Sequence, residues 1–453
     1  MKLFSIKGLS GLLEDDSYYL SIKKNDNRAL FYDKCNWLIS YIYRQNFGDK
    51  KDRNLFVNIH TDTLKKVLGG RYYRQVITTL ENLNIILTNK KYSASNFSMS
   101  YAISNRAVEI GMTNVEIQSN RFLKTYQNYC QSTYDEAKDN PLLWRIIYNT
   151  SKLYLTNNPA NYMAKILPKV SAPKAVTNMD LLNLWYDEIN MNRFNRYSTY
   201  FDSFMELNRH TDPFEVYKLP VFFMAKKAES GRIYHLAASV PKHIRECFIT
   251  KENEKIYEVD MASAQPSILL LEWMRWLGKR KALKQAENAE YELCRGLFLE
   301  GGIYAYIRDN SNYYSQFNTK EKYGELKEQI LKSLNGKKDK APFVVALKEL
   351  FPHFMKWVID IKEKEGHKRV SHIGQSAEAE IFVEVYKRLP EDIFSLIIHD
   401  CILTTKENTK LVRRLLVERL RELYGDIIPS GENLEKVFKI EKVTNEFANK
   451  SKI

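Results

Sequence analysis

An aspartate closes a strand-like run at two places in this chain, and this repeated arrangement limits the fold more than any other feature. The first run, Lys255–Asp260, alternates in the manner of a strand and ends on Asp260. Small residues follow, and Pro266 then opens an apolar run that suits a helix with proline in its first turn. We therefore expect Asp260 at a strand end, beside backbone that a ligand can approach closely.

The second aspartate follows an apolar run that reads as a buried strand, Phe394–Ile398. His399 and Asp400 then form a turn, and Cys401–Thr405 reads as a returning strand. This pattern predicts a β-hairpin with Asp400 at its tip.

Two carboxylates on neighbouring strand ends can hold two divalent cations between the reacting groups of a phosphoryl transfer. Mg²⁺ suits such a site because it takes few protein carboxylates and keeps its other positions for phosphate and water. One aspartate at a strand end is more often a turn former, but the occurrence of two favours chemistry. We therefore predict that Asp260 and Asp400 bind two Mg²⁺ ions, for which Mn²⁺ could substitute.

The charge of the chain favours a polyanionic partner. Its 453 residues contain 69 Lys and Arg against 55 Asp and Glu, a net charge of +14. Nucleic acid and a merely basic soluble enzyme explain this excess equally well. The five scattered cysteines, the lack of a long apolar run and an N-terminal segment unlike a secretory signal predict an intracellular protein without a membrane span.

Residues 1–110 hold half of the excess charge, a net +7. Their pattern predicts a short helix ending at Gly69, a second helix carrying Arg71 and Arg74, and then a two-stranded wing. This order is that of a winged helix, which would place Arg71 and Arg74 in or near a DNA groove. A helical domain that binds nothing is the equally weighted alternative.

Residues 111–230 read as mostly helical and rich in aromatic side chains, with a proline-containing linker at Thr156–Asp180. A thumb-like segment that grips a duplex fits this region. The first 230 residues are too few for a thumb together with a proofreading nuclease, and they show no convincing D-x-E strand, so we predict no 3′–5′ exonuclease.

Residues 231–453 resemble the polymerase module of family A DNA polymerases, because seven motifs occur in that family's order. Two of them carry the aspartates: Val259-Asp260 begins like motif A, and Ile398-His399-Asp400-Cys401 resembles V-H-D-E. The other five are Ser230-Gly231-Arg232-Ile233, Ile244–Ile249, Lys332–Gly336, Phe351–Trp357 and Gln375–Glu380. The resemblance implies an α+β right-hand fold, with an antiparallel palm sheet, helical fingers and a helical thumb.

The same resemblance implies a role for each matching residue. Asp260 and Asp400 would bind the metal ions, assisted by the Met261 carbonyl. Lys332 would meet the triphosphate, with phosphate recognition by a point charge as its physical reason. Contacts to primer and template are implied for Arg232, Arg245, Gln375 and His399. For these residues the alternatives are exposed arginines, a polar residue near a helix start and a residue that shapes the hairpin.

Several positions depart from the family pattern. Gln265, a nucleotide-binding candidate, replaces the glutamate that excludes ribose, and motif A also echoes family B. Glu328 stands where the family has an arginine, although Lys327 is adjacent, and Gly336 replaces an aromatic residue. Cys401 replaces a third acidic residue. Sugar selection is therefore an open question.

Together these features predict a template-directed nucleotidyltransferase, a DNA polymerase that acts on a primer-template and nucleoside triphosphates. Its expected setting is the replication of a phage- or plasmid-like element in a bacterial or phage-infected cell, where it could have replication partner proteins. A primase or single-subunit RNA polymerase on the same palm, and a non-enzymatic DNA-binding replication initiator, are the alternatives. A two-metal nuclease is a more distant one.

Overall fold

The computed structural model describes residues 2–46, 56–89, 99–155, 226–239, 245–278, 285–319, 322–337, 340–434 and 436–444. These residues divide into two compact units, of which the first comprises 2–136 and the second comprises 137–155 and 226–444. No helix in these ranges is both long and apolar enough to cross a membrane. The predicted linker at Thr156–Asp180 and most of the predicted thumb-like region lie outside the described residues.

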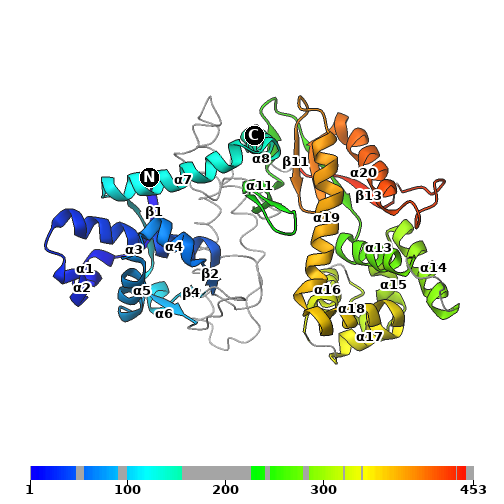
Figure 1. The fold of residues 1–453 in the computed structure, drawn as a ribbon, viewed down its shortest axis with the longest axis horizontal. Coiled ribbons are helices and arrows are strands. Elements are labelled where there is room, and N and C mark those ends of the chain that lie inside the picture. The colour runs from blue at the N-terminus through cyan, green and yellow to red at the C-terminus, as the bar shows by residue number, and fades with distance from the viewer. Residues whose placement is uncertain are drawn as a thin grey trace, which may run out of the picture. The chain divides into compact units, whose positions relative to one another are not determined.

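The first unit combines helices with short strands (Figure 1). Its elements are β1 (Lys2–Ile6), α1 (Leu9–Leu13), α2 (Ser17–Ser21), α3 (Asn25–Asn46), β2 (Val57–Asn58), α4 (Thr61–Leu68), α5 (Tyr73–Asn82), β3 (Ile86–Thr88), β4 (Ser100–Ile103), α6 (Asn105–Ile110), β5 (Met112–Glu116) and α7 (Asn120–Lys138). Strand β1 pairs with β5, and the other three strands form a sheet in the order β2-β4-β3.

The two short helices predicted in this unit are present. His60 caps α4 through its Nδ1, and the helix ends at Gly69, whose φ of +86° favours glycine. Val76, Ile77 and Leu80 of α5 are buried in the core of the unit. The order α4, α5, β3, β4 agrees with the predicted helix, turn, helix and strand pair, but β2 also pairs with β4, so the sheet has three strands where the sequence predicts two.

The second unit is larger and carries the two aspartates. Its elements are α8 (Pro141–Ser151), β6 (Leu153–Leu155), β7 (Lys226–Lys227), β8 (Ile233–Tyr234), α11 (Leu236–Ser239), β9 (Phe248–Thr250), β10 (Ile256–Met261), α13 (Ala264–Gly278), α14 (Gln285–Glu300), α15 (Ile303–Asp309), α16 (Tyr323–Asn335), α17 (Pro342–Leu350), α18 (Pro352–Glu365), α19 (Lys368–Arg388), β11 (Ser395–Ile398), β12 (Cys401–Thr405), α20 (Thr409–Tyr424) and β13 (Phe438–Lys442), with 3₁₀ turns at Tyr314–Gln316 and Lys406–Asn408.

An antiparallel sheet of four strands, in the order β11-β12-β10-β13, forms the centre of this unit. The strand and the hairpin that the sequence predicts around Asp260 and Asp400 are confirmed as β10, β11 and β12. Helix α13 begins at Ala264, so Pro266 lies in its first turn as expected. The described residues thus confirm the predicted mixture of helix and antiparallel sheet.

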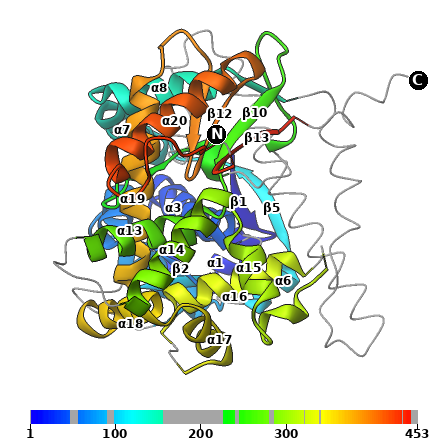
Figure 2. The ribbon, with the colours of Figure 1, turned by 90° about the vertical axis from the view of Figure 1, so that its right-hand side faces the viewer.

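Helices α19 and α20 cover one face of this sheet. The ring of Phe382 in α19 lies 6.4 Å from that of Phe438 in β13, and Phe438 stands opposite Met261 in the register. Figure 2 shows α20 beside β10, β12 and β13, with which it is in contact. Because side chains alternate along a strand, Asp260 projects from the other face. The helices therefore bury one side of the sheet and leave the aspartate on the opposite side.

Candidate active site

The sheet register brings Asp260 and Asp400 together. Asp260 pairs with Cys401, the residue that follows Asp400, and the Met261 N–H donates to the Asp400 carbonyl over 3.1 Å. The two aspartates therefore lie at adjoining strand ends although they are far apart in the sequence. The turn that carries Asp400 includes His399 in the left-handed region, with a φ of 51°.

Burial raises the pKa values of both carboxylates, and neighbouring negative charges raise that of Asp260 further. The pKa of Asp260 is raised to about 7, first by burial and then by the negative charges of Asp400, Glu258 and Glu441. Burial also raises the pKa of Asp400. Two ionised groups in this position oppose each other, so a bound cation would relieve an unfavourable interaction that the fold itself creates.

Three cations act against this negative charge. Lys327 lowers the pKa of both aspartates, and Arg232 and Arg245 lower that of Asp400. The Lys327 ammonium lies 4.9 Å from the ring centre of Tyr323 and 5.6 Å from that of Tyr304. Tyr304 is itself close enough to Asp400 for that charge to raise its pKa, after burial. Lys327 and Tyr304 are thus neighbours of the carboxylates.

Lys332 lies on another side of α16. Its Nζ is 2.7 Å from Glu328 Oε1, and both side chains are nearly half exposed. Five residues along a helix correspond to a rotation of about 140°, so Lys327 and Lys332 project in different directions. Lys327 was visible in the sequence only as the neighbour of the position where the family has an arginine.

Arg232 forms a buried ion pair with Glu378. Arg232 Nη2 lies 2.5 Å from Glu378 Oε2, and the side chain of Glu378 is only 3% exposed. The pair connects the turn before β8 to α19, which crosses near the hairpin. Burial raises the pKa of Glu378 to about 7 despite the pairing with Arg232. The sequence gives no sign of this pairing, because 146 residues separate its members.

The shift at Glu378 predicts a dependence of stability on pH. A carboxyl whose pKa is higher in the folded state stabilises the fold when protonated, and this contribution disappears as the pH rises through 7. The free energy of unfolding should therefore fall between pH 5 and 8, and Glu378→Gln should remove on the order of 2 kcal/mol of that fall. Urea unfolding of wild type and variant across this range measures the difference. Parallel curves would contradict the prediction.

His399 is held inside the hairpin turn. Its ring lies edge-on to Tyr234 at 5.7 Å, and burial with the charges of Arg232 and Arg245 lowers its pKa to about 4. The imidazole is therefore neutral at pH 7. Its Nδ1 is buried without a hydrogen-bond partner in the described part of the chain.

Gln265 and Gln375 lie where α13 and α19 cross. A Cβ at Gly374 would be 3.6 Å from Leu269 and 3.9 Å from Gln265, so the two helices approach closely at this glycine. Gln375 is an interior residue of α19, not one at its start, and its Nε2 donates to Ser371 Oγ. Both glutamine side chains are half-buried.

The oxygen atoms at this site are of the chemical types that bind a divalent cation. Carboxylate and backbone carbonyl oxygens are the ligands that Mg²⁺ takes, and Asp260, Asp400 and Met261 supply them. The described ranges contain no group of three or more His, Cys, Asp or Glu residues that could hold a metal ion. Phosphate and water would have to complete the coordination.

Arg71 and Arg74 belong to the first unit. Both are exposed, and Arg74 Nε donates to the Tyr73 hydroxyl over 2.9 Å. Arg74 lies in the first turn of α5, as the sequence predicts, but Arg71 lies in the turn before this helix, which begins at Tyr73. Their role in binding DNA stays a prediction.

Comparisons with known proteins find a remote likeness among solved structures alone. No family model and no curated protein matches the chain. Among solved structures it is similar to the POL domain of Pol1 from M. smegmatis in complex with DNA primer-template and dNTP, with a TM-score of 0.38 and 12% identity. The similarity covers 71% of this chain but 66% of that one, so the chain spans less than two thirds of its length.

Proposed function

We propose that this chain is a template-directed nucleotidyltransferase, and specifically a DNA polymerase that extends a primer. The observation that carries the proposal is the placement of Asp260 and Asp400 at adjoining ends of β10 and β12. The order of the motifs in residues 231–453 supports it. The proposed function does not include a proofreading 3′–5′ exonuclease.

The two carboxylates would hold the cations that activate the primer hydroxyl and stabilise the leaving pyrophosphate, which is the chemistry that such ions supply. The residues around them have separate tasks. Arg232 and Arg245 offset the negative charge at Asp400, and neutral His399, in the same turn, would lie beside the primer end. Gln265 and Gln375 border the nucleotide and primer on the α13 and α19 side.

Lys327 is the better candidate than Lys332 for the contact to the triphosphate. It acts electrostatically on both aspartates, whereas Lys332 has a carboxylate partner on its own helix. Tyr304 and Tyr323 flank the Lys327 ammonium and limit its freedom. A cation held near two metal-binding carboxylates is well placed for the phosphates of an incoming nucleotide.

Primer extension with separate nucleotide pools tests the proposed activity. We expect Mg²⁺-dependent extension to the end of the template with the four dNTPs and only slight extension with the four NTPs. Gln265 in place of the family's glutamate makes this comparison informative. Robust extension with NTPs alone would favour the primase or RNA polymerase alternative. No extension with either pool would favour the replication initiator.

The first unit is proposed as a DNA-docking module. Its helix order, its exposed Arg71 and Arg74 and its net charge support a winged helix that contacts the phosphate backbone. A polymerase with such a module would suit replication of a phage- or plasmid-like element.

A further inference from the structure

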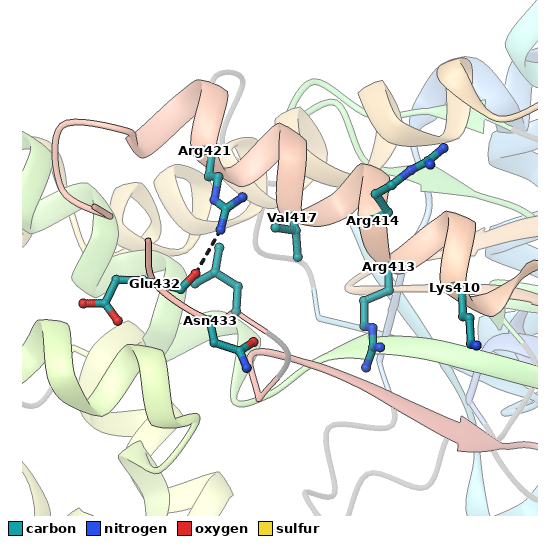
Figure 3. Close-up of a pocket in the computed structure, with 8 residues that line it drawn as sticks. Lys410, Arg413, Arg414, Val417, Arg421, Glu432 and Asn433 are labelled. Atoms are coloured by element: carbon teal, nitrogen blue, oxygen red, sulfur yellow. Dashed lines mark hydrogen bonds between the residues drawn. The ribbon is translucent and has the colours of Figure 1, made fainter. Parts of the chain in front are cut away.

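A basic groove lies on α20, in the second unit (Figure 3). It is a hollow of about 240 Å³ between the outer side of this helix and the segment that precedes β13. We call it the basic groove and define it by its charged and polar residues, Lys410, Arg413, Arg414, Arg421, Glu432 and Asn433. Four cations and one carboxylate give this lining a net charge of +3.

The apolar side of α20 leaves the cations to the rest of the helix, where Lys410 and Arg414 are exposed and Arg413 and Arg421 are half-buried. Val412, Leu416 and Leu420 are buried against the sheet and α19, and at about 100° per residue the groove residues of α20 lie on the neighbouring flank of the helix. Asp260 projects from the sheet face that α19 and α20 do not cover. The sheet therefore lies between the basic groove and the Asp260 side chain.

The Arg421 guanidinium is held in place within the groove. Arg421 Nη2 donates to the Glu432 carbonyl over 2.9 Å, which orients the guanidinium, and its Nε is buried with no hydrogen-bond partner among the described residues. Figure 3 shows the Glu432 carboxylate directed away from Arg421, so the guanidinium contacts the backbone carbonyl of this residue and not its carboxylate. Figure 3 also shows Lys410 and Arg413 projecting side by side.

The size and charge of the groove favour one class of ligand. Pockets for organic ligands usually enclose roughly 300–1,000 Å³, and this hollow is smaller. Lys410 and Arg421 are eleven residues apart, which is about 16 Å along a helix. A nucleic-acid strand that rises about 3.4 Å per nucleotide presents several phosphates over that distance. Guanidinium groups recognise phosphate oxygens through paired hydrogen bonds.

We propose that the basic groove binds the phosphate backbone of a nucleic-acid segment other than the one held at Asp260 and Asp400. Such a segment contacts the enzyme on the helix-covered side of its sheet. The inference goes beyond the proposed polymerase activity, because it concerns a second contact with nucleic acid and needs no chemistry at the aspartates.

The salt dependence of binding tests the inference. The full chain and Lys410→Gln/Arg413→Gln are titrated against fluorescent 20-mer oligonucleotides of mixed sequence, single- and double-stranded, between 50 and 200 mM KCl. Each phosphate contact contributes about 0.7–0.9 to the slope of log K against log salt. We expect the variant to lose about 1.5 from this slope and to bind about tenfold more weakly at 100 mM KCl.

A matched variant controls for the general loss of charge. Lys356→Gln/Lys364→Gln removes two positive charges from exposed positions on α18 in the same unit, and it should leave the slope almost unchanged. Equal slopes for wild type and the groove variant, or an equal loss in both variants, would overturn the proposal. A loss of binding to poly-glutamate without a loss of binding to either oligonucleotide would also overturn it, because the partner would then be an acidic protein.

Extension of a short primer separates this inference from the proposed function. If wild type extends the primer and the groove variant has an unchanged slope, the basic groove fails as a nucleic-acid site while the polymerase activity stands. If wild type extends no primer but the groove variant has a smaller slope of log K against log salt, the polymerase activity fails while the basic groove stands as a nucleic-acid site. Circular dichroism of both variants confirms that they fold, which is expected because the substituted side chains lie on outer helix faces.

Discussion

Asp260→Asn is expected to reduce nucleotide addition by about three orders of magnitude or more, the scale on which loss of a central catalytic group acts. The substitution keeps the size of the side chain but removes a charged ligand beside Asp400. Because burial and neighbouring negative charges raise the pKa of Asp260 to about 7, the same change removes an unfavourable charge. Asp260→Asn should therefore raise the free energy of unfolding at pH 8 by about 1–2 kcal/mol while it abolishes activity.

Single-turnover addition of one nucleotide measures the first effect and urea unfolding measures the second. Glu441→Gln is the matched control, because Glu441 stands opposite Glu258 in the register, is exposed, and also acts on Asp260. It should keep the rate within a factor of about three, the scale of a surface substitution. Near-normal activity of Asp260→Asn would remove this residue from the site.

Lys327→Met is expected to raise the KM for the incoming nucleotide by about 10- to 100-fold. Hydrogen bonds to charged groups contribute about 1.5–3 kcal/mol, which corresponds to that range. Methionine keeps the length of the side chain and its packing against Tyr304 and Tyr323 but lacks the ammonium group. Lys332→Met on the same helix should change KM by less than about threefold, since Glu328 pairs with Lys332.

Steady-state kinetics of primer extension with varied dNTP distinguishes the two lysines. Both variants remove one positive charge from α16, and the two lysine side chains differ mainly in the direction in which they project. A difference in KM therefore reports on that direction. A large effect at Lys332 with none at Lys327 would restore the assignment that the family motif implies.

The strand ends could be predicted because their signals are local. Alternation in Lys255–Asp260 and the apolar run, turn and apolar run around Asp400 specify a strand and a hairpin without knowledge of their surroundings. Local patterns do not show that the two strands are neighbours. The expectation rests on chemistry, because two carboxylates can share metal ions only when they lie side by side. The register of β10 with β12 confirms it.

The choice between Lys327 and Lys332 could not be made from the sequence. Both lie on one helix, and the side that faces the aspartates depends on how Leu326, Ile330 and Leu334 pack into the core. The spacing of the motif indicates Lys332, because the family pattern has its lysine at that position. The packing of α16 favours Lys327 instead.

Long-range pairings were also beyond the sequence. Arg232 reads as an exposed cation until Glu378 is found beside it, and the basic groove exists only because a loop near Glu432 lies against α20. In the sequence, Lys410, Arg413 and Arg414 are ordinary polar positions of an amphipathic helix. Such sites depend on the arrangement of segments, which local patterns do not encode.

The central claim is that Asp260 and Asp400 act as one unit in nucleotide addition. Single-turnover rates of wild type, Asp260→Asn, Asp400→Asn and the double variant test it most directly. The account predicts that each single variant loses almost all activity and that the double variant loses no more, because groups that act together are strongly non-additive. Independent losses that multiply in the double variant, or an active single variant, would contradict it.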